Sequence, residues 1–264
     1  MQASDRPAHL GPEYASQFSD PSAVEAYGHR APYPPEVFEI LLSLVQGQPR
    51  NVVDLGCGRG EIARALAPHV DRVDAIDPSA AMIAAGKTLP CGTHPRLHWA
   101  LGRAEEAVLT APCALAAAGN LHWMEWAQVL PRLARALAPH ACLAIVETGR
   151  SPAPWDESLL ALIRTFSTNS QFAPYDLASE LTGRRLLSVA GRREAKPVAY
   201  ERTVQEFIES IHAQNGFSRD RMDQAAADAF DREVRDLVSP YAERGRLRLT
   251  AVATVTWGRP AKRS

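Results

Sequence analysis

Several features that mark other classes of protein are scarce in this sequence. Its 264 residues include only 4 cysteines, Cys57, Cys91, Cys113 and Cys142, and none is close enough to another to form a CxxC-type metal site. We therefore expect no metal, and reduced thiols as in an intracellular protein. The first residues lack the apolar core of a secretory signal, and no apolar run is long enough to span a bilayer. These absences predict a cytoplasmic protein without a membrane partner.

An excess of charge of one sign is also lacking. The formal net charge is -1, so the overall charge gives no reason to expect a nucleic-acid partner. Hydrophobic residues make up 46% of the chain, which is enough to bury a core. The length suits one large α/β domain with a smaller appended part. A monomer and a homodimer both remain open.

Short apolar strands alternate with amphipathic helices through the first part of the chain. The expected strands are 51–55, 72–77, 97–101, 113–118 and 141–147, and the expected helices are 36–46, 61–67, 80–87 and 125–137. This alternation predicts right-handed βαβ units and a parallel sheet with helices on both faces. We therefore predict a Rossmann-like, doubly wound α/β fold with a mostly parallel, seven-stranded sheet.

The pattern changes after residue 147. A helix is expected near 157–168, a pair of strands within 184–200, and two or three helices within 203–244. Residues 248–257 are β-branched and alternating, which predicts a late antiparallel strand. The expected organisation is a loose N-terminal arm at 1–35 that contributes to a lid, a ligand-binding core at 36–150, a substrate and lid region with a helical insertion at 151–247, and a final strand and tail at 248–264.

A glycine-rich turn follows the first predicted strand. Gly56, Gly58 and Gly60 are spaced one residue tighter than the turn of dinucleotide-binding proteins, and Asp54 precedes them. Glycines at such a turn let the backbone approach a ligand closely. The tight spacing favours a ligand without phosphates, because a pyrophosphate needs an anion-binding turn. We interpret the turn as a site for S-adenosylmethionine, whose ammonium group Asp54 would attract directly or through water.

A second carboxylate supports this interpretation. Asp77 lies 23 residues after Asp54, at the end of the second predicted strand. A carboxylate at this position accepts hydrogen bonds from ribose hydroxyls. The alternative is a tight turn followed by a solvated Asp77. The glycines, the acid before them and the acid at this distance together favour the cofactor site.

The glycine turn resembles the first motif of the class I S-adenosylmethionine-dependent methyltransferases. The resemblance is strongest to their small-molecule branch, typified by ubiquinone-biosynthesis and trans-aconitate type enzymes. Residues 30–35, 102–105 and 121–124, with the sequences R-A-P-Y-P-P, G-R-A-E and L-H-W-M, resemble further segments of that branch. Arg103 departs from the pattern, because many relatives carry an acid there that contacts the adenine.

The resemblance implies a cofactor and an activity. It implies S-adenosylmethionine as the methyl donor, S-adenosylhomocysteine as the product and a small molecule as the acceptor. The implied cofactor-binding residues are Arg30, Asp54, Gly56, Cys57, Gly58, Gly60, Asp77, Pro78, Arg103, Ala104, Glu105, Asn120, Leu121 and Trp123. Methyl transfer mainly requires positioning, and a general base only if the acceptor must lose a proton early. His122 is the candidate base; alternatively, it and Trp123 only wall the cofactor pocket.

Aromatic and polar side chains are the candidates for binding the acceptor. They are Tyr14, Phe18, Tyr33, Trp155, Tyr175 and His212, with Glu147, Tyr200, Glu201 and Arg202 as further groups expected to face a substrate. The alternative for His212 is a boundary position on an amphipathic helix. Three other functions stay open: a cyclisation or elimination aided by the bound sulfonium, a non-catalytic cofactor-binding partner and, least favoured, a dehydrogenase.

Overall fold

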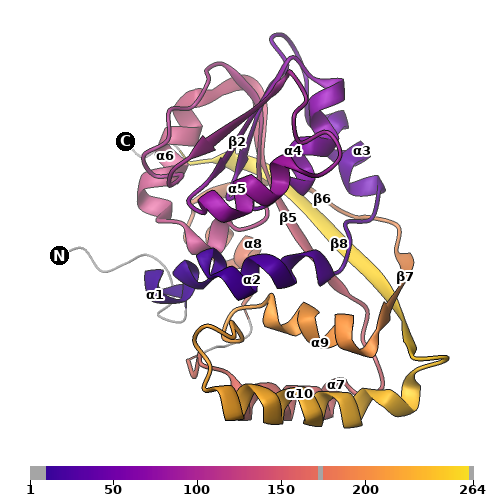
Figure 1. Ribbon diagram of the computed structural model, residues 1–264. Coiled ribbons are helices and arrows are strands. Elements are labelled where there is room, and N and C mark those ends of the chain that lie inside the picture. Colours follow the sequence, from indigo (N-terminus) through magenta and orange to yellow (C-terminus); the bar gives the residue numbers. More distant parts are fainter. Residues whose placement is uncertain (1–9, 172–174, 262–264) are drawn as a thin grey trace.

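The parallel part of the sheet is as predicted. The computed structural model describes residues 10–171 and 175–261. Within these residues the strand order is β3-β2-β1-β4-β5-β8-β6, with β7 also paired to β8 (Figure 1). The parallel strands are β1 Asn51–Leu55, β2 Arg72–Asp77, β3 Leu97–Leu101, β4 Cys113–Ala118 and β5 Leu137–Arg150. The first four begin and end at the predicted residues, and only β5 is longer than expected.

The late strand is antiparallel, as predicted, and lies between β5 and the sheet edge. β8 spans Arg246–Pro260 and pairs on its outer side with β6, Leu187–Glu194, and then with β7, Val198–Thr203. The described sheet therefore has eight strands, one more than expected. β6 and β7 are the pair of strands expected within 184–200, and Pro197 lies between them, where proline's missing N–H costs no ladder bond.

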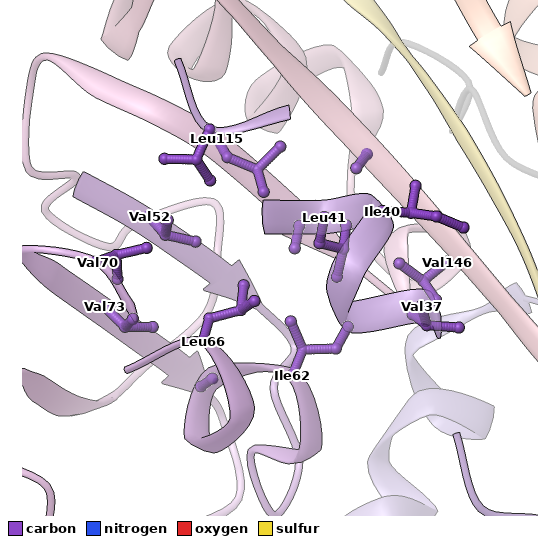
Figure 2. Close-up of a cluster of buried hydrophobic side chains, with 14 of the residues drawn as sticks. Val37, Ile40, Leu41, Val52, Ile62, Leu66, Val70, Val73, Leu115 and Val146 are labelled. Carbon is purple, nitrogen blue, oxygen red and sulfur yellow. The ribbon is translucent and has the colours of Figure 1, made fainter. Parts of the chain in front are cut away.

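Helices cover both faces of the sheet because consecutive strand residues point to opposite sides. Leu115 belongs to the cluster under α3, Glu36–Leu44, and α4, Glu61–Leu66, as Figure 2 shows. Its neighbour Ala116 belongs to the cluster under α6, Trp126–Ala136, and α8, Leu177–Gly183. α5, Ala80–Lys87, packs on β2 and β3. These two apolar layers hold the carboxyl ends of the strands in place.

A third apolar cluster forms beyond β5. It joins α7, Asp156–Phe166, α9, Val204–His212, and α10, Gln224–Val238, which we call the cap. α9 starts with a capping box, in which Thr203 Oγ1 accepts from Glu206 N at 3.1 Å and the Glu206 carboxylate accepts from Thr203 N at 2.7 Å. Short 3₁₀ turns at Ala67–His69, Leu121–Trp123 and Ser239–Tyr241 complete the connections.

The N-terminal segment is helical where a loose arm was expected. The described part contains α1 Pro12–Ala15, a 3₁₀ turn at Ser16–Ser19, α2 Pro21–Ala26 and another turn at Tyr27–His29. Pro12 and Pro21 begin the two α-helices, the position at which proline's missing N–H removes no intrahelical bond. Figure 1 shows α2 between the sheet and α9. No helix in the described part of the chain is long and apolar enough to cross a membrane.

Candidate functional site

Two adjoining cavities open at the carboxyl ends of the strands. The smaller has a volume of about 260 Å³ and the larger about 970 Å³. Phe18, Tyr27, Asn120 and Trp123 line both. An elongated ligand can therefore extend from one cavity into the other.

The glycine turn forms one wall of the smaller cavity. Gly56 and Gly58 line it with φ of +63° and +56°, left-handed values that favour glycine. A Cβ at Gly56 would lie 3.1 Å from Met124 Cε, so a side chain there would crowd the wall. Gly60 lines neither cavity, and a Cβ there would lie 2.4 Å from the Trp99 ring. Glycine at position 60 is therefore needed for the packing of the turn against Trp99, and it does not contribute to the cavity surface.

Asp77 ties the glycine turn to the start of α5. Its Oδ2 accepts the Gly58 N–H at 2.7 Å and its Oδ1 accepts the Ser79 N–H at 2.8 Å. The carboxylate lines the smaller cavity, and burial raises its pKa despite these two hydrogen bonds. Each oxygen keeps lone-pair capacity beyond the bond it already accepts. Asp77 could therefore accept further hydrogen bonds from hydroxyl groups of a ligand.

Three of the expected cofactor residues lie beneath the cavity surface. Asp54, which is 2% exposed, accepts the Ala63 N–H at 3.1 Å, and burial raises its pKa to about 8. Burial also raises the pKa of the Cys57 thiol. Leu121 is fully buried, and its carbonyl accepts from Trp126 Nε1 at 2.9 Å. None of the three lines either cavity.

The far end of the smaller cavity is lined by Pro78 and by residues 103–105. Arg103 Nε donates to Glu105 at 3.4 Å, and the other Glu105 oxygen accepts the Glu125 N–H at 2.8 Å. Phe18, from the N-terminal segment, closes the opposite wall and contacts Trp123 edge-on at 5.6 Å between ring centroids. The lining of this cavity is mainly apolar.

Asn120 stands where the cavities meet. Its Nδ2 donates to the Gly56 carbonyl at 2.9 Å, which fixes the glycine turn against the end of β4. His122 follows in the 3₁₀ turn and lines the larger cavity. Its ring lies 4.9 Å from that of Trp123. The candidate base thus opens into the larger cavity, next to the junction.

Arg30, Tyr33 and Tyr175, which were expected to bind cofactor or substrate, also line the larger cavity. The Arg30 guanidinium lies 5.1 Å from the centre of the Tyr27 ring. Tyr33 stacks on Phe38, and burial raises the pKa of its phenol. Burial likewise raises the pKa of Tyr175. Both tyrosines therefore remain neutral hydroxyls at neutral pH.

Three expected substrate residues do not reach either cavity. Trp155 packs in the cap against Phe207, with ring centroids 5.9 Å apart. The backbone carbonyl of Tyr14 accepts from Asn215 Nδ2 at 3.0 Å. His212 is 1% exposed inside the cap. The side chains of Trp155 and His212 are buried because the cap has its own apolar core.

The ring of His212 is held between two acceptors. Nδ1 lies 2.6 Å from the Phe217 carbonyl and Nε2 lies 2.7 Å from Asp231 Oδ1. Because a carbonyl only accepts, Nδ1 carries a proton. Burial opposes ionisation of Asp231, but its hydrogen bond and ion pair with His212 hold its pKa below the usual range. The pair joins α9 to α10.

Several cavity residues have no motif in the sequence. Tyr27 lines both cavities, and Phe207, Ser210 and Ile211 contribute the face of α9 toward the larger one. Their position follows from how the N-terminal segment and the cap fold over the strand ends. Glu147, Tyr200 and Arg202 line the larger cavity, whereas Glu201 does not. The described residues contain no cluster suited to a metal ion.

Comparisons with known proteins match part of the chain to methyltransferases. Residues 52–140 match the model of a family described as a methyltransferase domain. Uncharacterized methyltransferases of Mycobacterium bovis and Mycobacterium tuberculosis are 34% identical to this chain over 128 residues, which are 47% of this chain and 50% of each relative. The chain thus spans about half the length of the curated relatives it matches.

Solved structures share the fold over most of the chain. A provisionally assigned type II methyltransferase from Anaeromyxobacter dehalogenans matches with a TM-score of 0.65 and 23% identity, covering 87% of this chain and 97% of that one. The 4+2 cyclase SpnF matches with a TM-score of 0.56 and 16% identity, covering 97% and 98%. The family match thus covers residues 52–140, and the solved structures share the fold of most of the chain.

Proposed function

We propose that the chain transfers a methyl group from S-adenosylmethionine to an oxygen, nitrogen or carbon atom of a small molecule. The observation that carries this proposal is the junction of the two cavities. The smaller has the glycine turn and Asp77, and the larger has His122 beside the shared residues Asn120 and Trp123. The size of the larger cavity, about 970 Å³, is within the range of small-molecule sites.

The residues of the smaller cavity fit the adenosine part of the cofactor. In this proposal Asp77 accepts the ribose hydroxyls, while Ala104 and Glu105 lie along the adenine. The Arg103 guanidinium is held by Glu105, so it does not take over the adenine contact that an acid makes in many relatives. Arg30 meets the cofactor carboxylate from the larger cavity. Asp54 reaches the ammonium group only through water, because its side chain is not on the cavity surface, and the bound cation draws this carboxyl toward its ionised form.

The protein's own contribution to the reaction is positioning and exclusion of water. When bound, S-adenosylmethionine supplies a methyl group already activated by its sulfonium. The cap and the N-terminal segment enclose the acceptor, and His122 takes the acceptor's proton where the acceptor must lose one. A His122→Phe variant would retain cofactor affinity and lose turnover. Full turnover in this variant would remove His122 as base and leave it as a wall of the cavity.

The experiment that tests the function uses a cofactor labelled in its methyl group. The protein is incubated with this cofactor and a metabolite extract, with heat-denatured protein as the control. We expect a labelled product of small-molecule size that forms only with folded protein. Cofactor binding without any transfer of label, across extracts of differing polarity, would contradict methyl transfer.

A non-methylating reaction is the second candidate. The fold alone does not separate it from methyl transfer, since SpnF, a 4+2 cyclase, has this fold over 98% of its length. Such a reaction would convert a metabolite in the same extract while leaving the labelled methyl group on the cofactor. A non-catalytic cofactor-binding partner would do neither. The same incubation, followed by mass spectrometry of unlabelled products, therefore distinguishes the three.

A further inference from the structure

Glu147 lies on the larger cavity, near the point where the cavities meet. The β4–β5 register ends with Ala118 opposite Ile145, so Glu147 stands two residues further along, level with the segment that carries Asn120. Strand alternation puts its side chain on the same sheet face as Ile145. Glu147 and Ile145 both line the larger cavity. Its carboxylate therefore borders the space in which an acceptor would sit.

Most other charged side chains of this cavity have partners within the protein. These are Arg59 and Arg64 with Glu61 at 3.0 and 3.8 Å, Arg150 with Asp156, and Arg202 with the carbonyls of His29 and Arg30 at 3.2 and 3.1 Å. Arg30 lies over the Tyr27 ring and is proposed to meet the cofactor carboxylate. Over 10–171 and 175–261, by contrast, no group donates a hydrogen bond to the Glu147 carboxylate or forms an ion pair with it. The carboxylate of Glu147 is therefore available to accept hydrogen bonds from a ligand.

The surroundings of Glu147 make an added donor favourable. The side chain is half-buried, and burial raises its pKa; Asp176 raises it further, whereas Arg192 lowers it. A carboxylate withdrawn from water without a hydrogen-bond donor is unfavourable. A ligand that brings an N–H or O–H group restores the lost hydrogen bond. A ligand carboxylate at the same place would be repelled.

The cap contributes polar side chains, such as Asp156 and Ser210, and several apolar ones to the cavity. Its apolar lining includes Leu159, Ile163, Phe207 and Ile211. We propose that Glu147 binds the methyl acceptor, and that the acceptor is a mainly apolar molecule presenting an amino or hydroxyl group to this carboxylate. This inference rests on the proposed function for the existence of an acceptor. It makes Glu147 a specificity-determining residue of that site.

Three probes with one carbon skeleton test the inference: phenylbutylamine, phenylbutanol and phenylbutyrate. Affinities are measured by calorimetry at mildly alkaline pH, with the protein saturated by S-adenosylhomocysteine. We expect the amine to bind tightest and the acid weakest, with a ratio of about tenfold or more, the scale of a charged hydrogen bond. Glu147→Gln should weaken the amine about tenfold and leave the alcohol within about threefold. Glu194→Gln, an exposed glutamate of β6 outside the cavity, is the matched control.

The outcomes separate this inference from the proposed function. Tighter binding of the acid than of the amine, or equal amine affinity in Glu147→Gln and wild type, would overturn the role of Glu147. Failure of all three probes to bind would contradict the proposal that the acceptor is a mainly apolar molecule. In either case, intact binding of S-adenosylhomocysteine leaves the cofactor site standing. Loss of that binding in the wild type would instead contradict the proposed function itself.

Discussion

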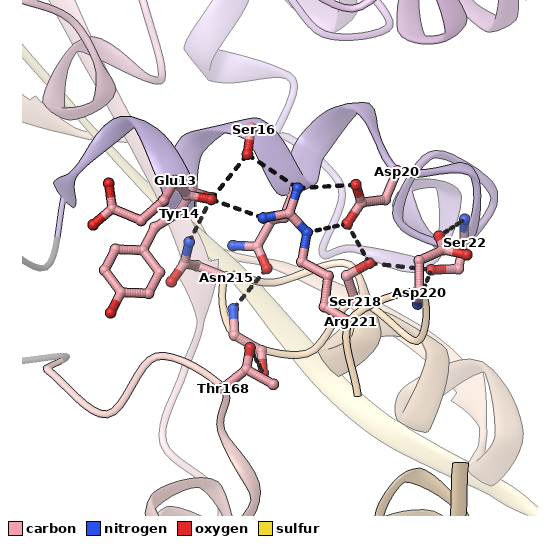
Figure 3. Close-up of polar contacts among 12 residues, drawn as sticks. Glu13, Tyr14, Ser16, Asp20, Ser22, Thr168, Asn215, Ser218, Asp220 and Arg221 are labelled. Carbon is pink, nitrogen blue, oxygen red and sulfur yellow. Dashed lines mark hydrogen bonds and ion pairs between the residues drawn. The ribbon is translucent and has the colours of Figure 1, made fainter. Parts of the chain in front are cut away.

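The sheet core and the seam between the N-terminal segment and the cap are held together by different physics. Around β1 and β4 the contacts are apolar and fully buried, with Leu41 and Leu115 at 0% exposure (Figure 2). The arm–cap seam, between residues 12–22 and 214–221, consists mostly of hydrogen bonds and ion pairs (Figure 3). The core thus fixes the glycine turn at the strand ends, whereas the seam joins the N-terminal segment to the cap through polar contacts.

The seam matters because the N-terminal segment forms a wall of the smaller cavity. Ser16 and Phe18 line that cavity, while Gln17 between them accepts the Gly216 N–H at 2.9 Å. Asp20 accepts from Ser218 Oγ at 2.7 Å and from Arg221 Nε at 2.6 Å. One wall of the proposed cofactor site is therefore attached to the cap as well as to α5 of the sheet core. We expect cofactor exchange to require opening of this seam.

The largest expected effect is on the core. Leu115→Ala removes a fully buried side chain of β4, so it should lower the free energy of unfolding by about 3 kcal/mol through lost burial and a residual cavity. Leu160→Ala, in which the removed side chain is 42% exposed, is the control and should change it by less than about 1 kcal/mol. Urea unfolding measures both. Equal losses of unfolding free energy in the two variants would mean that the sheet core contributes no more to stability than the surface of α7.

The next largest effect is expected at the proposed cofactor site. Asp77→Ala removes the proposed ribose acceptor and the carboxylate that holds Gly58 and Ser79. It should weaken binding of S-adenosylhomocysteine by about 1–3 kcal/mol, the range for lost hydrogen bonds to a charged group. Calorimetric titration measures the affinity, and circular dichroism checks that the variant is folded. Asp71→Ala, just before β2, should bind like wild type. An unchanged affinity in Asp77→Ala would rule out the proposed placement of the ribose.

The same contrast explains what the sequence could predict. β1 to β4 and α5 have the predicted bounds because their signals are local: apolar strands, a glycine turn and the Ser79 cap, which accepts from Met82 N at 3.3 Å. Asp77 and Asn120 belong to the same local pattern. The seam depends on residues about two hundred positions apart, such as Asp20 and Arg221, and neither belongs to a motif. The burial of Trp155 and His212 in a separate cap core likewise follows from tertiary packing alone.

Two carboxylates, one in each region, should respond oppositely to pH. Burial raises the pKa of Asp54 to about 8, so the folded protein keeps a proton there that the unfolded chain loses above its usual pKa of 3.8. Asp54 thus stabilises the fold at low pH, and this contribution declines as the pH rises from about 4 to 8, at up to about 1.4 kcal/mol per unit. Urea unfolding at several pH values should show this slope in wild type and a shallower one in Asp54→Asn. Equal slopes would mean that Asp54 is ionised in the fold.

Asp20 of the seam provides the contrast to Asp54. Burial opposes its ionisation, but hydrogen bonds from Arg221 and Ser218 hold its pKa below 3.8. Its contribution is present above that value and is lost as the pH falls through its folded-state pKa. Asp20→Asn should therefore leave the slope between about pH 4 and 8 unchanged.

The smallest effect on stability, and the most informative about the seam, is expected for Arg221→Ala. Arg221 donates to both oxygens of Asp20, to the Glu13 carbonyl at 2.7 Å and to Ser16 Oγ at 3.0 Å. Partly exposed ion pairs contribute about 0–1 kcal/mol, so the free energy of unfolding should change by less than about 1 kcal/mol. Because the seam would open more often, stopped-flow dissociation of S-adenosylhomocysteine should become about threefold to tenfold faster.

Arg248→Ala is the matched control for this seam variant, because its ion pairs with Glu201 and Glu243 lie on the exposed end of β8. It should change neither the stability nor the dissociation rate. If Arg221→Ala lowered stability as much as Leu115→Ala, the seam would be part of the core and the two regions would fold as one. If Arg221→Ala left the dissociation rate unchanged, the N-terminal segment would not control access to the proposed cofactor site. Faster dissociation with nearly unchanged stability is the combination that only a separable cover produces, because a wall built into the sheet could not open without unfolding it.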